Sequence, residues 1–128
     1  MFFKINIMSR DSKLKLQWEK VVGLISDKFG GGEKLDLDSI TYLIGVEELG
    51  KGFQKFKKDD KINIMHIAIC KLLEPFGFYE FDFYDGDGWP HYKILDEIPF
   101  LKPGEQSVLM KEAIVMYFEN KGVLFSDH

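Results

Sequence analysis

Five polar side chains cluster in residues 80–91, and their types are those that bind cations or move protons. They are Glu80, Asp82, Asp85, Asp87 and His91. Carboxylates beside a histidine can ligate a divalent cation or act as general acid and base. The spacing departs from the calcium-binding loop, because Trp89 stands where that loop needs its third oxygen ligand. Aspartates are also ordinary turn residues, so a site at Asp82, Asp85, Asp87 and His91 competes with a simple turn.

His66 and Cys70 form a second candidate pair, four residues apart and therefore on one face of a helix. Such a pair could supply two metal ligands, or a nucleophile with its base. A metal site needs three or four ligands, and no second local pair completes this one. A core histidine beside a small buried thiol explains both residues, and we favour that interpretation.

The stretch GVEELGKG at residues 45–52 is one letter away from the phosphate-binding loop G-x-x-x-x-G-K-[ST]. Gly52 stands where the magnesium-binding hydroxyl belongs. A phosphate loop follows a strand and opens a helix, whereas this stretch closes one. Gly50 and Gly52 are better explained as helix stops, so we expect no nucleotide and no other cofactor.

The segment LDLDSI at residues 35–40 places Asp38, Ser39 and Ile40 at the start of a helix. It resembles the serine segment of acyl carrier proteins, where an Asp-Ser-Leu start to the second helix bears phosphopantetheine. The resemblance covers about 15 residues and implies modification at Ser39. The long acidic loop that precedes this serine in the family is missing here. Helix capping by the same side chains is the competing explanation.

Basic and aromatic residues alternate in KGFQKFKK, residues 51–58, as they do in single-strand nucleic-acid-binding segments. Asp59 and Asp60 follow at once, and no other basic patch supports such a function. We expect a solvated segment with Phe53 and Phe56 turned inward.

Hydrophobic periodicity predicts four helices. The first starts at Asp11 or Ser12 and ends at the glycines 30–32, and the second starts within residues 36–39 and ends at Gly50 or Gly52. The third covers residues 61–74 and is apolar almost all round, which predicts a buried helix. The fourth runs from Pro103 to about Asn120.

The alternation in residues 78–84 and 89–97, joined by DGDG, predicts an antiparallel hairpin and hence an α+β fold. A loop at 86–87 would oppose Glu80 to Lys93, Asp82 to His91 and Tyr84 to Trp89. Loops at 85–86 and 87–88 are the alternatives, and each of the three loops places Pro90, Tyr92 and Ile94 on the face of Phe81. A third strand is expected from residues 1–8 or from the C-terminal end, with a flexible tail at 125–128.

The composition indicates one globular domain over residues 1–128. Hydrophobic residues make up 45% and include twelve Phe, which is too apolar for disorder. The net charge is −4, and the second half is the more acidic, which disfavours nucleic acid as a partner. One cysteine and no long apolar run predict a cytoplasmic protein without a membrane partner.

No convergent catalytic set emerges, so the sequence favours a non-enzymatic interaction or structural module. Tyr84 and Trp89 on the outer face of the hairpin, beside Glu80 and Lys93, are expected to bind a protein partner or a second copy in a homodimer. The alternatives are a small metal-dependent enzyme at the hairpin carboxylates and His91, and a carrier-like protein modified at Ser39.

Overall fold

The structure is a computed structural model that describes residues 2–122, and the chain divides into two compact units. The first unit combines the residues up to Asp36 with those from Pro103 onward, and the second is Leu37–Lys102. The single domain over residues 1–128 stays a prediction. No helix within residues 2–122 combines the length and the apolar character needed to cross a membrane.

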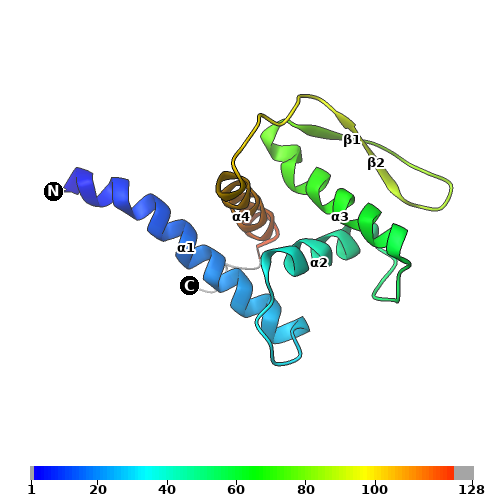
Figure 1. The fold of residues 1–128 in the computed structure, drawn as a ribbon, viewed down its shortest axis with the longest axis horizontal. Coiled ribbons are helices and arrows are strands. Elements are labelled where there is room, and N and C mark those ends of the chain that lie inside the picture. The colour runs from blue at the N-terminus through cyan, green and yellow to red at the C-terminus, as the bar shows by residue number, and fades with distance from the viewer. Residues whose placement is uncertain (1, 123–128) are drawn as a thin grey trace. The chain divides into compact units, whose positions relative to one another are not determined.

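Four α-helices, a short 3₁₀ helix and a two-stranded antiparallel sheet make up the described chain (Figure 1). In order they are α1 (Phe2–Phe29), α2 (Leu37–Leu49), α3 (Lys58–Leu73), η1 (Glu74–Phe76), β1 (Tyr79–Tyr84), β2 (Pro90–Ile94) and α4 (Pro103–Asn120). The predicted α+β class, with four helices and one hairpin, is confirmed.

The predicted N-terminal strand is wrong, because α1 already begins at Phe2. The alternation that suggested a strand spans only residues 3–7. Neither proline nor glycine occurs between residues 2 and 22, so nothing stops the helix from extending by one hydrogen bond per residue. The described residues contain no third strand. The predicted C-terminal strand and tail lie mostly or wholly outside residues 2–122.

The first unit consists of α1, α4 and the loop that follows α1, and the two helices contact each other. α1 ends at Phe29, as predicted from the glycines that follow, and Gly31 and Gly32 adopt positive φ angles of 62° and 96°. Ser26 holds the loop against the helix, since its hydroxyl accepts the N–H of Leu35 at 2.9 Å. The buried apolar side chains of the two helices are Val21, Val22, Ile25, Ala113, Ile114, Val115 and Tyr117.

The second unit is built on a close crossing of α2 and α3, which lie side by side in Figure 1. At the crossing, Gly45 meets the backbone of Ile64, and a Cβ on Gly45 would overlap the Ile64 carbonyl. A buried cluster fills the contact, with Tyr42, Phe56 and Trp89 packed against it. Its members are Val46, Leu49, Ile64 and Ile67.

α3 is the central helix of this unit, as its apolar sequence predicted, and it contacts α2, η1 and both strands. Its buried residues are Ile64, Ile67, Ala68, Cys70, Leu72 and Leu73. It begins at Lys58, three residues before the predicted start at residue 61, and Lys57 at the N-cap makes no side-chain capping bond. Pro75 lies within η1, which follows α3 directly and ends at Phe76, where Gly77 forms the C-cap with a φ of 86°.

The hairpin register is partly as predicted. Glu80 opposes Lys93, and Phe81 opposes Tyr92, but Phe83 rather than Asp82 opposes His91. The ladder is irregular between Phe81 and Phe83, so Asp82 is the extra residue of a bulge. A bulge reverses the facing of the residues beyond it.

This reversal moves two aromatic side chains. Tyr84 opposes Pro90 and lies 4.9 Å from Phe81, ring centroid to ring centroid, so it shares the Phe81 face. Phe83 lies instead on the face of Glu80 and Lys93, where Tyr84 was predicted. The prediction that Pro90, Tyr92 and Ile94 lie on the Phe81 face is confirmed, and the pairing of Tyr84 with Trp89 is wrong.

Candidate functional site

Asp85 organises the turn at the hairpin tip. Its backbone carbonyl accepts the Gly88 N–H at 3.0 Å, and its own N–H donates to the Trp89 carbonyl at 2.9 Å. One oxygen of its carboxylate, Oδ1, accepts the N–H groups of Asp87 and Trp89 at 2.9 and 3.0 Å. Gly88 closes the turn with a φ of 85°, a conformation that suits glycine. The DGDG sequence therefore forms a turn, as predicted, with one carboxylate at its centre, but Asp85 and Trp89 enclose a loop of residues 86–88 instead of the predicted 86–87.

The second oxygen of Asp85 orients a histidine. Oδ2 lies 2.9 Å from Nε2 of His91, and the imidazole stacks on the Phe83 ring with 4.6 Å between centroids and 3° between planes. These hydrogen bonds, first the one to His91 and then the one from Trp89, hold the pKa of Asp85 below its ordinary value. An ionised carboxylate that fixes one ring nitrogen of a histidine is the arrangement that orients a general base.

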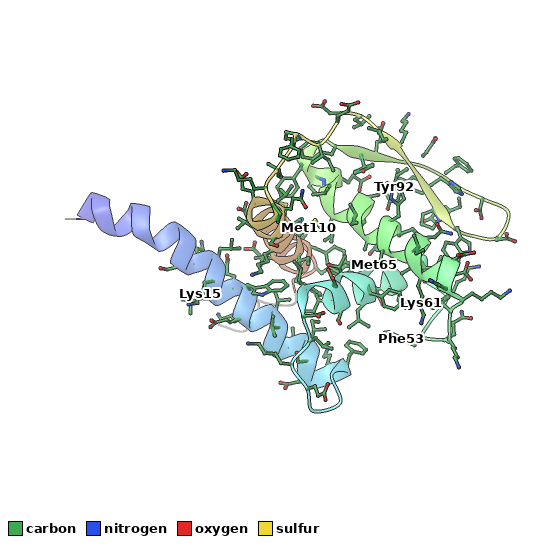
Figure 2. The ribbon with its side chains drawn as sticks, viewed as in Figure 1. Lys15, Phe53, Lys61, Met65, Tyr92 and Met110 are labelled. Atoms are coloured by element: carbon green, nitrogen blue, oxygen red, sulfur yellow. The ribbon has the colours of Figure 1, made fainter. Side chains whose placement is uncertain are left out.

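A pocket of about 380 Å³ lies between the tip and α3. It is lined by Asp60, Asn63, His66, Ile67, Asp85, Asp87, Trp89, Pro90, His91 and Tyr92. Tyr92 lies on the hairpin beside α3 (Figure 2), and burial raises the pKa of its phenol, so the hydroxyl stays protonated at neutral pH. The lining includes three carboxylates and neither lysine nor arginine.

The structure brings together three of the four predicted acid–base residues. Asp85, Asp87 and His91 line this pocket with His66, whereas Asp82 lies at the bulge and is not part of the lining. Glu80 forms an exposed ion pair with Lys93 at 3.6 Å.

Asp60 and Asn63 were missed as pocket residues. The sequence carries a signal for them, because Asp60, Asn63 and His66 recur every third residue and form a polar stripe on an otherwise apolar helix. What the spacing does not reveal is that the hairpin tip lies against that stripe.

His66 and Cys70 are adjacent, with 3.4 Å between Nε2 and Sγ. Cys70 is fully buried, as predicted, while His66 is exposed on the pocket side of α3, so the prediction of a core histidine is wrong. Burial raises the pKa of the Cys70 thiol to about 11. A thiol of that pKa is protonated at neutral pH, which argues against a nucleophile activated by His66.

No three or more His, Cys, Asp and Glu side chains within residues 2–122 are placed so that they could hold a metal ion. In the tip pocket, Asp85 already accepts three hydrogen bonds. The arrangement can orient a histidine for proton transfer, and it offers no ready metal-ligand set.

The predicted aromatic surface is rearranged by the bulge. Trp89 is half-buried and packs against the cluster around Ile64, so the expectation that it stands exposed on the outer face is wrong. Its ring also lies 5.8 Å from the ammonium of Lys51, which donates a hydrogen bond to the Asp87 carbonyl. Tyr84 is exposed, with 64% of its surface accessible, and Phe83 is 49% exposed.

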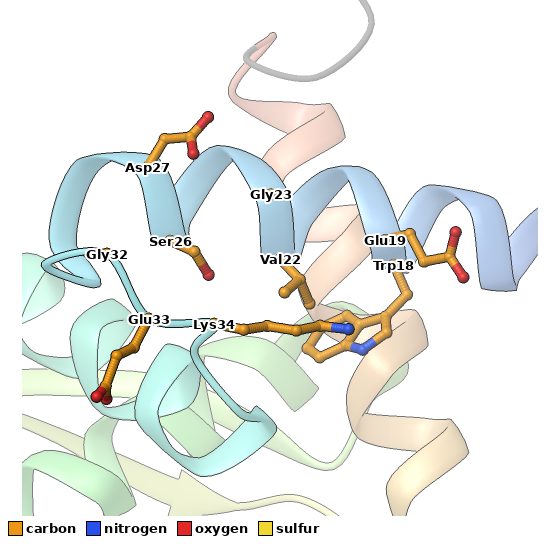
Figure 3. Close-up of a pocket in the computed structure, with 9 residues that line it drawn as sticks. All are labelled: Trp18, Glu19, Val22, Gly23, Ser26, Asp27, Gly32, Glu33 and Lys34. Atoms are coloured by element: carbon orange, nitrogen blue, oxygen red, sulfur yellow. The ribbon is translucent and has the colours of Figure 1, made fainter.

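A second pocket, of about 460 Å³, lies in the first unit (Figure 3). Trp18, Val22, Gly23 and Ser26 come from α1, while Gly32, Glu33 and Lys34 come from the loop that follows it. The ammonium of Lys111 on α4 lies 5.6 Å from the Trp18 ring. The sequence gives no local signal for this pocket, because the pocket depends on how the loop folds back on α1.

The near-match to a phosphate loop is explained by packing. Gly45 lies inside α2 at the crossing with α3, and Gly50 ends α2 with a φ of 74°. Ser39 is the third residue of α2 and is half-buried. Its modification stays a prediction.

Comparison of the chain with protein-family models, with curated proteins and with solved structures gives no match. The case for a function therefore depends on the geometry of the described residues.

Proposed function

We propose that this chain is a non-enzymatic protein-interaction module that associates with a second copy of itself through the distal half of the hairpin. The observation that carries the proposal is the exposure of two aromatic side chains at the hairpin tip, with Phe83 49% exposed on the face of Glu80 and Lys93 and Tyr84 64% exposed on the opposite face. Aromatic side chains in this position are typical anchors of protein interfaces. Glu80 and Lys93 border Phe83 on the same face and supply a polar rim.

The contact is made by side chains of the tip rather than by strand addition to β1. The N–H of Phe81 on β1 donates to the carboxylate of Glu74 at 3.1 Å, so the chain itself occupies that part of the strand. The bulge at Asp82 also acts against regular pairing along β1, and the charge of Lys93 acts against it along β2. A partner that wraps the tip, and so contacts Phe83 on one face and Tyr84 on the other, avoids all three obstacles.

Sedimentation equilibrium of the full chain tests the proposal. The wild type is expected to form dimers at about 50 µM, within the range where a micromolar dissociation constant populates them. Phe83→Thr with Tyr84→Thr keeps strand propensity and should shift the chain toward monomer. Leu16→Gln on α1 removes an equally exposed apolar side chain, 62% accessible, and should leave the dimer intact. A wild type that stays monomeric at every concentration would contradict the proposal.

The second candidate is an acid–base enzyme at the tip pocket, favoured by the 2.9 Å contact between His91 and Asp85. His91 would be the base and Asp85 its positioning residue. This function is tested by adding candidate small molecules and measuring the NMR chemical shifts of the His91 ring. Chemical-shift changes at His91 that vanish in Asp85→Asn would favour the enzyme over the interaction module.

A further inference from the structure

The rim of the tip pocket carries surplus negative charge. Asp60, Asp85 and Asp87 line it, and of these Asp85 is engaged by His91 and by the turn. Among residues 2–122, the carboxylates of Asp60 and Asp87 form neither a salt bridge nor a side-chain hydrogen bond. The pocket has aromatic walls in Trp89 and Tyr92. Its surface is suited to a partner that offers cations around an apolar side chain.

The same unit displays such a group in residues 51–58, named here the basic linker. It holds four lysines, and Lys55, Lys57 and Lys58 are exposed and make no ion pair within the described part of the chain. Phe56 packs against the buried cluster, which anchors the linker, while Phe53 is 61% exposed (Figure 2). The expectation that both phenylalanines turn inward is therefore met by Phe56 alone.

The pocket and the basic linker are neighbours, because Lys51 joins them. Its ammonium donates to the Asp87 carbonyl and lies 5.8 Å from the Trp89 ring. This contact shows that an ammonium is accommodated at the rim of the pocket. It also places the acidic tip pocket and the basic linker next to each other on one unit. In a two-fold symmetric dimer, the linker of each copy can then contact the pocket of the other, so the same contact forms twice.

We infer that the proposed dimer is held by an exchange of these two features. The basic linker of each copy lies over the tip pocket of the other, with Lys55 and Lys57 opposite Asp60 and Asp87 and with Phe53 beside Trp89. This inference rests on the proposed self-association and adds the residues that confer its specificity. A surface ion pair contributes little by itself, but four related pairs act together and are weakened by salt.

Complementary charge reversal tests the exchange. One variant carries Lys55→Glu and Lys57→Glu, and the other carries Asp60→Lys and Asp87→Lys. Each variant alone should self-associate at least about tenfold more weakly than the wild type, because attraction becomes repulsion. An equimolar mixture should restore dimers, visible by native mass spectrometry as a heterodimer of both variants.

Two controls keep the test decisive. Lys13→Glu with Lys15→Glu reverses two exposed charges on α1 and should leave the dimer unchanged. Asp60→Asn with Asp87→Asn removes the acidic charge without adding a cation, so it weakens the dimer even where the lysine variant folds poorly. Circular dichroism establishes that each variant is folded.

The outcomes separate the two proposals. A wild-type dimer that is unaffected by either reversal, or weakened variants that fail to combine, would overturn the exchange and leave the hairpin dimer standing. A wild type that remains monomeric would contradict both the hairpin dimer and the exchange. The wild type could also stay monomeric and bind a lysine-rich peptide, with binding abolished by Asp60→Asn and Asp87→Asn. That result would show that the pocket binds a different basic protein, and it would overturn the proposal that the partner is a second copy.

Discussion

The Asp85 carboxylate holds His91 through one oxygen, at 2.9 Å from Nε2, and the backbone of its own turn through the other. A single side chain thus couples the shape of the hairpin tip to the orientation of the histidine. Loss of the charge on Asp85 should disturb both.

Acid is the condition that removes this charge. The pKa of Asp85 is lower in the folded chain than in the unfolded chain, so its contribution to stability is present above the unfolded pKa and is lost as pH falls through the folded value. Asp85→Asn should therefore lose less stability than the wild type between pH 5 and pH 2, a window set by the ordinary carboxyl pKa of about 4. Urea unfolding across this range measures the difference. Parallel pH profiles of the two proteins would show that Asp85 is not coupled to folding.

Gly45 and Gly23 both lie inside helices, and replacing each with alanine should have opposite effects on the free energy of unfolding. Alanine at Gly45 would push its Cβ into the Ile64 carbonyl and bring it 2.7 Å from the Ile64 Cγ2, so α2 and α3 must separate. We expect Gly45→Ala to lower the free energy of unfolding by about 1–3 kcal/mol.

Gly23 lies inside α1 with nothing within 4 Å of an added Cβ. Gly23→Ala should raise the free energy of unfolding by about 0.5–1 kcal/mol, because alanine favours the helix. Denaturant unfolding of both variants checks the pair. Equal effects at the two positions would be inconsistent with the close crossing at Gly45.

Cys70 gives a direct report on burial, since it is the only thiol in the chain. Its full burial and its pKa of about 11 predict that iodoacetamide labels the native protein far more slowly than it labels free cysteine. The labelling rate should rise with urea in step with the unfolded population. Rapid labelling without urea would instead point to a thiol activated by His66, 3.4 Å away.

Local signals in the sequence were sufficient to predict most of the helices and the hairpin. The glycines after Phe29 and at position 50 end helices through positive φ angles, and the DGDG turn forms where its composition requires. Strand alternation failed at residues 3–7, because five residues of period two are outweighed by a long helix without breakers.

The candidate site could be predicted only in part. Asp85, Asp87 and His91 are close in sequence, and the turn alone brings them together. Asp60 and Asn63 join them through the packing of the hairpin on α3, which no local pattern encodes. The bulge at Asp82 reverses the facing of Phe83 and Tyr84, so alternation beyond that residue placed both aromatic side chains on the wrong face.

Hydrogen–deuterium exchange at two protein concentrations tests the central claim most directly, because it locates the contact as well as detecting it. At a concentration that favours dimers, exchange should slow in residues 51–58 and 83–91 relative to a dilute sample, and it should be unchanged in α1 and α4. Slowing confined to α1 or α4, or exchange that is independent of concentration in a sample that sediments as a dimer, would contradict an association through the hairpin tip.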